Sequence, residues 1–143
     1  MKRLLIGFKG KHNTSSLILN QLDVAGDQIL LTNSIQGIKK DLNSIELEAY
    51  DYIFLFGCRK QLENHILLEL AAGTKEEVLE SSFPWENFSE KINRTVHFGL
   101  CNTAYYEILK RNRNAILIHI PSIRNVKFLP NISVSINRII KSL

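Results

Sequence analysis

The stretch DYIFLFG, residues 51–57, decides the fold of this chain. Between its leading aspartate and its final glycine it holds only aromatic and aliphatic side chains, which is typical of a strand buried on both faces of a sheet. Similar but shorter apolar runs occur at residues 3–8, 28–32 and 115–120. Segments with helical spacing of apolar residues alternate with these runs. We therefore predict an α/β protein, in which residues 1–143 form a single three-layer αβα domain around a mostly parallel central sheet.

Polar capping residues and apolar residues at helical spacing predict five helices. They are expected at residues 13–22, 35–48, 85–92, 101–111 and 131–143. A short strand is expected at residues 95–98. Residues 66–70 fit a strand or a helix, because periodicity cannot decide over five residues.

The composition is that of an ordinary globular protein, with 45% hydrophobic and 22% charged residues among 143. This excludes disordered, collagen-like and low-complexity classes. The longest apolar run is too short to cross a bilayer, and no signal peptide pattern fits the first residues. Two cysteines are too few for a disulfide framework. We expect a cytoplasmic protein with two reduced thiols and no membrane association.

The net charge of +4 hides an asymmetry along the chain. Residues 1–90 carry nine Lys and Arg against thirteen Asp and Glu, whereas residues 91–143 carry nine Lys and Arg and one acid. Such a basic segment can bind an anionic partner, form a solvated face, or meet the acidic part of a second copy in a homo-oligomer. Nucleic acid is not an expected partner, because no basic run is interleaved with aromatic residues.

A cysteine and a histidine follow two of the predicted strands. Cys101 opens a helix after residues 95–98, and His119 lies near the end of residues 115–120. The carboxyl ends of parallel strands meet at one edge of a sheet, so we expect thiol and imidazole within hydrogen-bond reach, as in a cysteine nucleophile and its base. The helix N-terminus would lower the pKa of Cys101. The alternative is structural, because a cysteine on an apolar helix face is usually a small hydrophobic residue.

Two segments around these residues carry specific sequence, GLCNTAYY at residues 99–106 and IHIP at residues 118–121. Three weaker segments precede them, and these are LIGF at residues 5–8, NTS at residues 13–15 and YIFLFG at residues 52–57, followed by Arg59. In this order the five segments resemble the motifs of pyroglutamyl peptidase I, a family of cysteine peptidases. The resemblance spans residues 1–121.

The resemblance implies hydrolysis of an N-terminal pyroglutamyl or related amide bond, so the expected partner is a peptide or small amide substrate. It implies Cys101 as nucleophile, His119 as general base and acid, and Glu63 as the carboxylate that orients the imidazole, with Glu69 as the alternative. Substrate and oxyanion contacts would come from Gly7, Phe8, Arg59 and Asn102. No cofactor is implied, and no metal, because the histidines form no ligand-spaced cluster.

The sequence departs from the family in two places. Residues 7–12 read GFKGKH, so the second phenylalanine that grips the pyroglutamyl ring in the family has no counterpart here. The segment between Glu69 and Thr95 is shorter than in the family. We therefore expect weak hydrolysis of simple pyroglutamyl substrates. Two other functions stay open, a catalytically silent homologue that binds a peptide or protein, and a basic-surface protein that binds an anionic partner.

Overall fold

The computed structural model describes residues 1–10, 13–122, 124, 127 and 129–143. The strands are β1 (Arg3–Phe8), β2 (Asp27–Leu31), β3 (Tyr52–Arg59), β4 (Leu67–Glu69), β5 (Ala71–Gly73), β6 (Val78–Glu80), β7 (Lys91–Asn93) and β8 (Ala115–Pro121). The helices are α1 (Thr14–Leu19), α2 (Ile35–Asn43), α3 (Leu100–Leu109) and α4 (Leu129–Lys141), with 3-10 turns η1 (Leu47–Ala49) and η2 (Trp85–Asn87).

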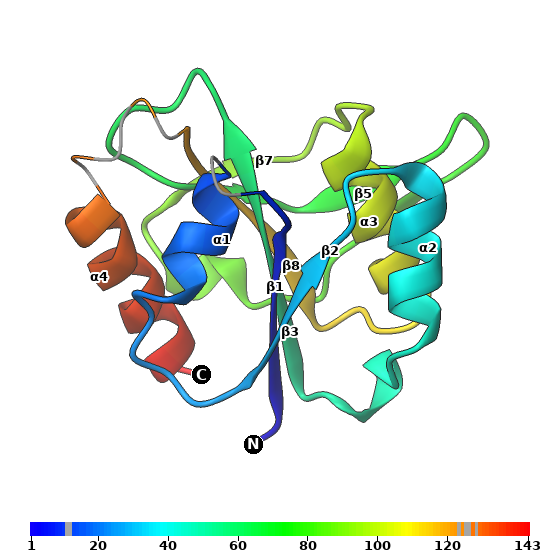
Figure 1. Cartoon of the computed structure of the whole chain (residues 1–143), viewed down its shortest axis with the longest axis horizontal. Coiled ribbons are helices and arrows are strands. Elements are labelled where there is room, and N and C mark those ends of the chain that lie inside the picture. The colour runs from blue at the N-terminus through cyan, green and yellow to red at the C-terminus, as the bar shows by residue number, and fades with distance from the viewer. Residues whose placement is uncertain (11–12, 123, 125–126, 128) are drawn as a thin grey trace.

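Six of the strands form one central sheet in the order β2-β1-β3-β8-β4-β7. Helices α1 and α4 cover one face, and helices α2 and α3 cover the other (Figure 1). All neighbouring pairs are parallel except β4 and β8. The predicted α/β class with a mostly parallel central sheet is therefore confirmed. None of the described helices is long and apolar enough to cross a membrane.

Alternation along the two central strands decides which side chains meet which helices. Successive residues of a strand point to opposite faces of the sheet. In β3 and β8 the even-numbered apolar residues pack against α1 and α4, and the odd-numbered ones pack against α2 and α3. The two strands pair in parallel with Gly57 opposite His119. Both residues belong to the odd-numbered series, so they lie on the face that α3 covers.

The middle of the chain differs from the sequence expectation. Residues 66–70 contain the strand β4, while residues 85–92 form only the turn η2 and the start of β7. Residues 95–98 are not a strand. Phe83 and Phe88 stack with ring centroids 5.7 Å apart, and Phe83 meets Phe54 edge to face. These tertiary aromatic contacts, which local periodicity does not report, hold the segment against the sheet.

Part of the charge asymmetry is neutralised within the chain. Arg111 pairs with Glu48, Arg138 with Glu90, and Lys141 with Asp23. Each pair joins the basic segment of residues 91–143 to the acidic segment of residues 1–90. The excess basic charge is therefore not all available to an external partner.

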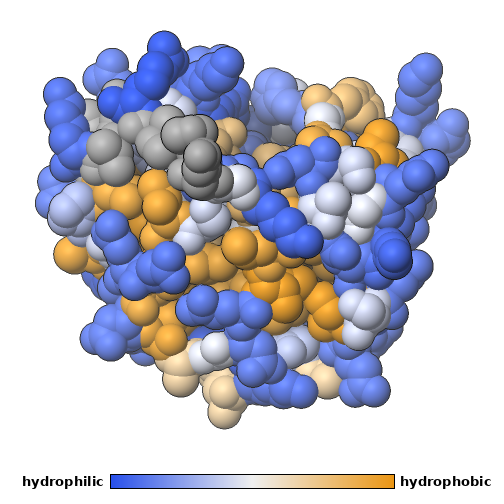
Figure 2. Space-filling model, in the orientation of Figure 1, coloured by the Kyte–Doolittle hydropathy of each residue, from blue (hydrophilic) through white to orange (hydrophobic). Residues whose placement is uncertain are grey.

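Apolar side chains reach the surface at one edge of the sheet. Figure 2 shows them across the middle of the face that is turned to the viewer. Strand β2 is the outermost strand at this edge, and its Leu30 is exposed. The opposite edge is formed by the short strand β7.

Two buried side chains tie α3 to the strands next to it. The hydroxyl of Tyr105 donates to the backbone oxygen of Glu69 at 2.7 Å. The side-chain amide of Asn102 accepts from the backbone N–H of Gly73 at 3.0 Å and donates to its oxygen at 2.9 Å. Buried polar groups satisfied in this way hold elements in one relative position. The start of α3 is thereby positioned against β4 and β5.

Replacing Tyr105 by Phe should lower the free energy of unfolding by about 1–2 kcal/mol, because a buried carbonyl loses its hydrogen-bond donor. Urea denaturation measures this loss. Tyr106→Phe is the matched control, since the Tyr106 hydroxyl bonds to Glu77 near the surface. The control should change the free energy by about 0.5 kcal/mol or less. Equal losses in the two variants would contradict the role given to Tyr105.

Candidate active site

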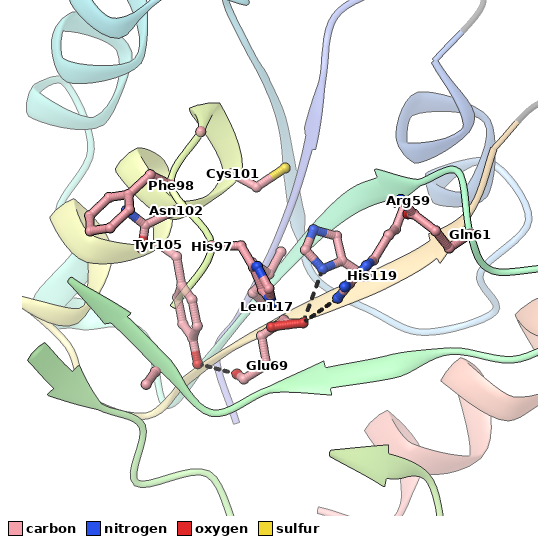
Figure 3. A pocket seen from close by; sticks show the side chains of 12 residues that line it. Arg59, Gln61, Glu69, His97, Phe98, Cys101, Asn102, Tyr105, Leu117 and His119 are labelled. Atoms are coloured by element: carbon pink, nitrogen blue, oxygen red, sulfur yellow. Dashed lines mark hydrogen bonds and ion pairs between the residues drawn. The ribbon is translucent and has the colours of Figure 1, made fainter. Parts of the chain in front are cut away.

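A cavity of about 300 Å³ lies between the start of α3 and the carboxyl-terminal parts of β3 and β8. Figure 3 shows the side chains that line it. They are Arg59, Gln61, Glu69, Ala71, His97, Phe98, Gly99, Cys101, Asn102, Tyr105, Leu117 and His119. Among the described residues no cluster of three His, Cys, Asp or Glu side chains could hold a metal ion.

The thiol of Cys101 and the imidazole of His119 both lie beside Gly57. A Cβ atom built on Gly57 would lie 2.6 Å from Sγ of Cys101 and 3.4 Å from Nε2 of His119. Both groups therefore occupy the space that a side chain at position 57 would need. Among the described residues no hydrogen bond joins thiol and imidazole, and catalytic contacts are often longer than hydrogen bonds before substrate binds.

The other ring nitrogen of His119 faces a buried carboxylate. Nδ1 of His119 lies 3.3 Å from Oε1 of Glu69, whose side chain is 5% exposed. Glu69 also accepts from Nδ2 of Asn93 at 2.9 Å and from Nη1 of Arg59 at 3.3 Å. The contact with His119 is long and not well aligned as a hydrogen bond. It is still close enough for the carboxylate to attract a proton on the ring.

Glu69 stays charged although it is buried. Burial acts to raise the pKa of its carboxyl group, but the close approach of His119 Nδ1, the hydrogen bonds from Asn93 and the charge of Arg59 together hold that pKa below its ordinary value. Glu69 is therefore an anion at neutral pH. A buried anion beside an imidazole stabilises the imidazolium that forms when the ring takes a proton.

The thiol at the same site is shifted in the opposite direction. Burial raises the pKa of Cys101 to about 12, and Cys58 and Glu69 act in the same sense. The expected lowering of this pKa by the helix N-terminus is wrong, because the cost of burying a thiolate outweighs the partial charge of the helix end. Cys101 is thus a neutral thiol at pH 7, and it needs a base at the moment of attack.

Neither a protein-family model nor a curated protein sequence matches this chain. Solved structures do match. The pyrrolidone carboxyl peptidase from Thermus thermophilus is 17% identical with a TM-score of 0.70, over 99% of this chain and 97% of that chain. A mutant pyrrolidone carboxyl peptidase from Pyrococcus furiosus is 15% identical with a TM-score of 0.67, over 99% and 95%. Pyroglutamyl peptidase I from Bacillus amyloliquefaciens is 12% identical with a TM-score of 0.66, over 97% of each chain.

The chain has the pyroglutamyl peptidase fold. The structural match establishes the fold. At a sequence identity of only 12–17%, the chemistry has to be argued from this chain's own residues. The resemblance expected from the sequence motifs is confirmed at that level.

Within this fold the carboxylate beside His119 is that of Glu69, which the sequence offered as the alternative to Glu63. Glu63 is exposed in the segment between β3 and β4. Strand β4 pairs antiparallel with β8, with Leu67 opposite His119 and Glu69 opposite Leu117. Glu69 therefore lies on the same face of the sheet as His119. This pairing joins distant segments, so motif spacing could not identify it.

The expected substrate and oxyanion contacts are only partly brought to the cavity. Arg59 and Asn102 line it, but the Asn102 side-chain amide is already bonded to Gly73. Gly7 and Phe8 do not line it. The backbone N–H of Phe8 donates to Oγ of Ser15 at 2.9 Å, so it is not available to an oxyanion.

The cavity lining also includes Gln61, His97 and Phe98, which the sequence motifs do not single out. Phe98 is 69% exposed and adds an aromatic side chain to the cavity lining, whereas the opening loop lacks the second phenylalanine of the resembled family. Lys11 and His12 of that loop lie outside the described residues. The available signal was position alone, since His97 and Phe98 directly precede the GLCNTAYY segment.

Alkylation should reveal the neutral state of the half-buried Cys101 thiol. We expect iodoacetamide to modify Cys101 slowly at pH 7, with a rate that keeps rising through about pH 10 because little thiolate exists below its pKa. Mass spectrometry after timed alkylation gives the rate for each cysteine. The Cys101→Ser variant shows the contribution of Cys58. A Cys101 rate that levels off below about pH 7 would contradict this, since it would indicate a preformed thiolate beside an imidazolium.

Proposed function

We propose that this protein is a cysteine peptidase that hydrolyses an N-terminal pyroglutamyl or related amide bond. One observation carries the proposal, the convergence of Cys101, His119 and Glu69 on a single cavity of a pyroglutamyl peptidase fold. The three side chains come from α3, β8 and β4. A nucleophile, a base and a group that orients the base are the parts that covalent amide hydrolysis needs.

In the proposed reaction Sγ of Cys101 attacks the carbonyl carbon while its proton passes to Nε2 of His119. The raised thiol pKa makes this coupled transfer necessary, because no thiolate stands ready at neutral pH. The tetrahedral intermediate then collapses. The C–N bond breaks, the leaving amine takes the proton from His119, and the acyl group stays on sulfur as a thioester. Water, deprotonated by His119, hydrolyses the thioester and returns the thiol.

Two further groups assist these steps. Glu69 stabilises the imidazolium form of His119 in both halves of the reaction. The unpaired N–H groups at the start of α3, beside Cys101, are the proposed donors to the oxyanion. They take the place of the Phe8 N–H, which Ser15 occupies.

The function is tested by release of an arylamine from a pyroglutamyl arylamide. We expect slow hydrolysis by the wild-type protein and none by Cys101→Ala. Cys58→Ala is the control, because the Cys58 thiol bonds to Asn13 at 3.1 Å and does not line the cavity. It should keep the wild-type rate. Absence of any Cys101-dependent hydrolysis, across pyroglutamyl and other N-blocked amides, would favour the catalytically silent homologue.

The two candidate carboxylates can be separated by a matched pair of variants. Glu69→Gln should lower kcat at least about a hundredfold, because the imidazolium loses its anion. Glu63→Gln should stay within about twofold of the wild type, since its side chain is exposed. Steady-state kinetics on the arylamide gives both values, and urea denaturation checks that Glu69→Gln is folded. A loss caused by Glu63→Gln alone would overturn the assignment.

A further inference from the structure

Arg59 brings into the cavity a guanidinium that takes no direct part in the proposed attack or proton transfer. It is the last residue of β3 and lies two positions beyond Gly57, so alternation places it on the face that carries His119. Its side chain is 28% exposed and lines the cavity. Figure 3 shows the guanidinium reaching back toward His119 and Glu69.

The described residues use only a small part of the hydrogen-bonding capacity of Arg59. Among the described residues its one hydrogen bond runs from Nη1 to Oε1 of Glu69, at 3.3 Å. A guanidinium has five N–H donors in a planar fork, and the edge formed by Nε and Nη2 can bind both oxygens of one carboxylate. Partly buried cations with free donors at a cavity wall are suited to an anionic group of a ligand.

The cavity offers such a group little repulsion. Glu69 is the only acid among its described lining residues, and its charge is already compensated by Arg59 and by hydrogen bonds from Asn93. Gln61 lines the same cavity and adds an amide donor. The charges of Arg59 and Glu69 cancel, so a ligand carboxylate would be attracted by the N–H donors of Arg59 that no described residue uses, and not by a net positive charge of the cavity.

The size of the cavity limits where that anionic group can be. Arg59 and Cys101 line the same space of about 300 Å³, which is at the lower end for small-molecule sites. Because both residues line this one small space, we expect a carboxylate held by Arg59 to lie only a few bonds from the carbonyl carbon that Cys101 attacks. In a dipeptide, or any N-acyl amino acid, one carbon atom separates the scissile amide nitrogen from the carboxylate.

We propose that Arg59 binds the free carboxylate that directly follows the scissile amide, so that the substrates are N-acyl amino acids of dipeptide size and not longer peptides. This inference rests on the proposed function, because it names the substrate class of the same site. It assigns Arg59 to specificity. The bond that breaks and the path of the proton are unchanged.

The test compares pyroglutamyl-alanine with pyroglutamyl-alaninamide, which share the scissile bond and differ only in the carboxylate. We expect the wild-type kcat/KM to favour the acid about tenfold or more, mainly through KM, because a charge-assisted bidentate contact is lost in the amide. Arg59→Gln should bring this ratio to about one. Lys60→Gln, which removes the exposed neighbouring cation, is the control and should keep the ratio. A merely structural Arg59 would slow both substrates and leave the ratio unchanged.

Other outcomes overturn the proposal. A wild-type ratio near one, or a preference that survives in Arg59→Gln, would do so. Equal activity on pyroglutamyl-aspartyl amide, whose carboxylate is on a side chain, would also contradict an α-carboxylate site. The Arg59→Lys variant should show a reduced but measurable preference for the acid over the amide. It replaces Arg59→Gln in the test if that variant does not fold.

Binding separates a failure of this inference from a failure of the proposed function. Calorimetric titration of the Cys101→Ala protein with the same two compounds needs no turnover. Tighter binding of the acid, lost in Cys101→Ala/Arg59→Gln, supports the carboxylate site even if the wild-type protein hydrolyses neither compound. Equal binding of the two compounds, or no binding of either, overturns it, whatever the outcome of the arylamide assay.

Discussion

Cys101 can approach His119 only because residue 57 has no side chain. The sulfur lies where a Cβ on Gly57 would be 2.6 Å away, which is closer than real Cβ atoms come to other heavy atoms. Any other residue would push the start of α3 away from the sheet. The parallel register of β3 and β8 then matters, since it sets Gly57 directly opposite His119. The candidate site therefore depends on a glycine in a central strand with the imidazole of His119 next to it.

The site also contains two acidic groups, the carboxyl of Glu69 and the thiol of Cys101, whose pKa values shift in opposite directions. Burial acts to raise the pKa of both Cys101 and Glu69. The carboxyl group of Glu69 stays charged because His119, Asn93 and Arg59 lie against its oxygens, whereas none of the described residues stabilises a thiolate at Cys101 in this way. Environments that push the pKa values of neighbouring groups apart assign different roles to them. Here they favour Glu69 as a charged group that orients the imidazole, and Cys101 as a nucleophile that loses its proton only during attack.

Likeness of fold and likeness of site are separate matters in this chain. Nearly the whole chain superimposes on pyroglutamyl peptidases at 12–17% identity. The opening loop nevertheless lacks the second phenylalanine of the resembled motif, while Phe98 stands exposed at the cavity from another segment. Arg59 adds a cation whose N–H donors are mostly not used by the described residues. The fold is shared, but the side chains around the cavity differ from the resembled motif. Such a difference is consistent with a substrate that differs from that of the solved relatives.

The sequence by itself determined the elements whose signals are local. The apolar run at residues 51–57, the polar caps before α1, and the segments around Cys101 and His119 need no distant partner to be recognised. Glu69 could not be chosen over Glu63 in this way. Its place beside His119 comes from the antiparallel pairing of β4 with β8, and Phe88 is likewise held by stacking on Phe83, which packs against Phe54 of β3. Both depend on segments far apart along the chain, and only packing of the whole sheet decides which of them meet.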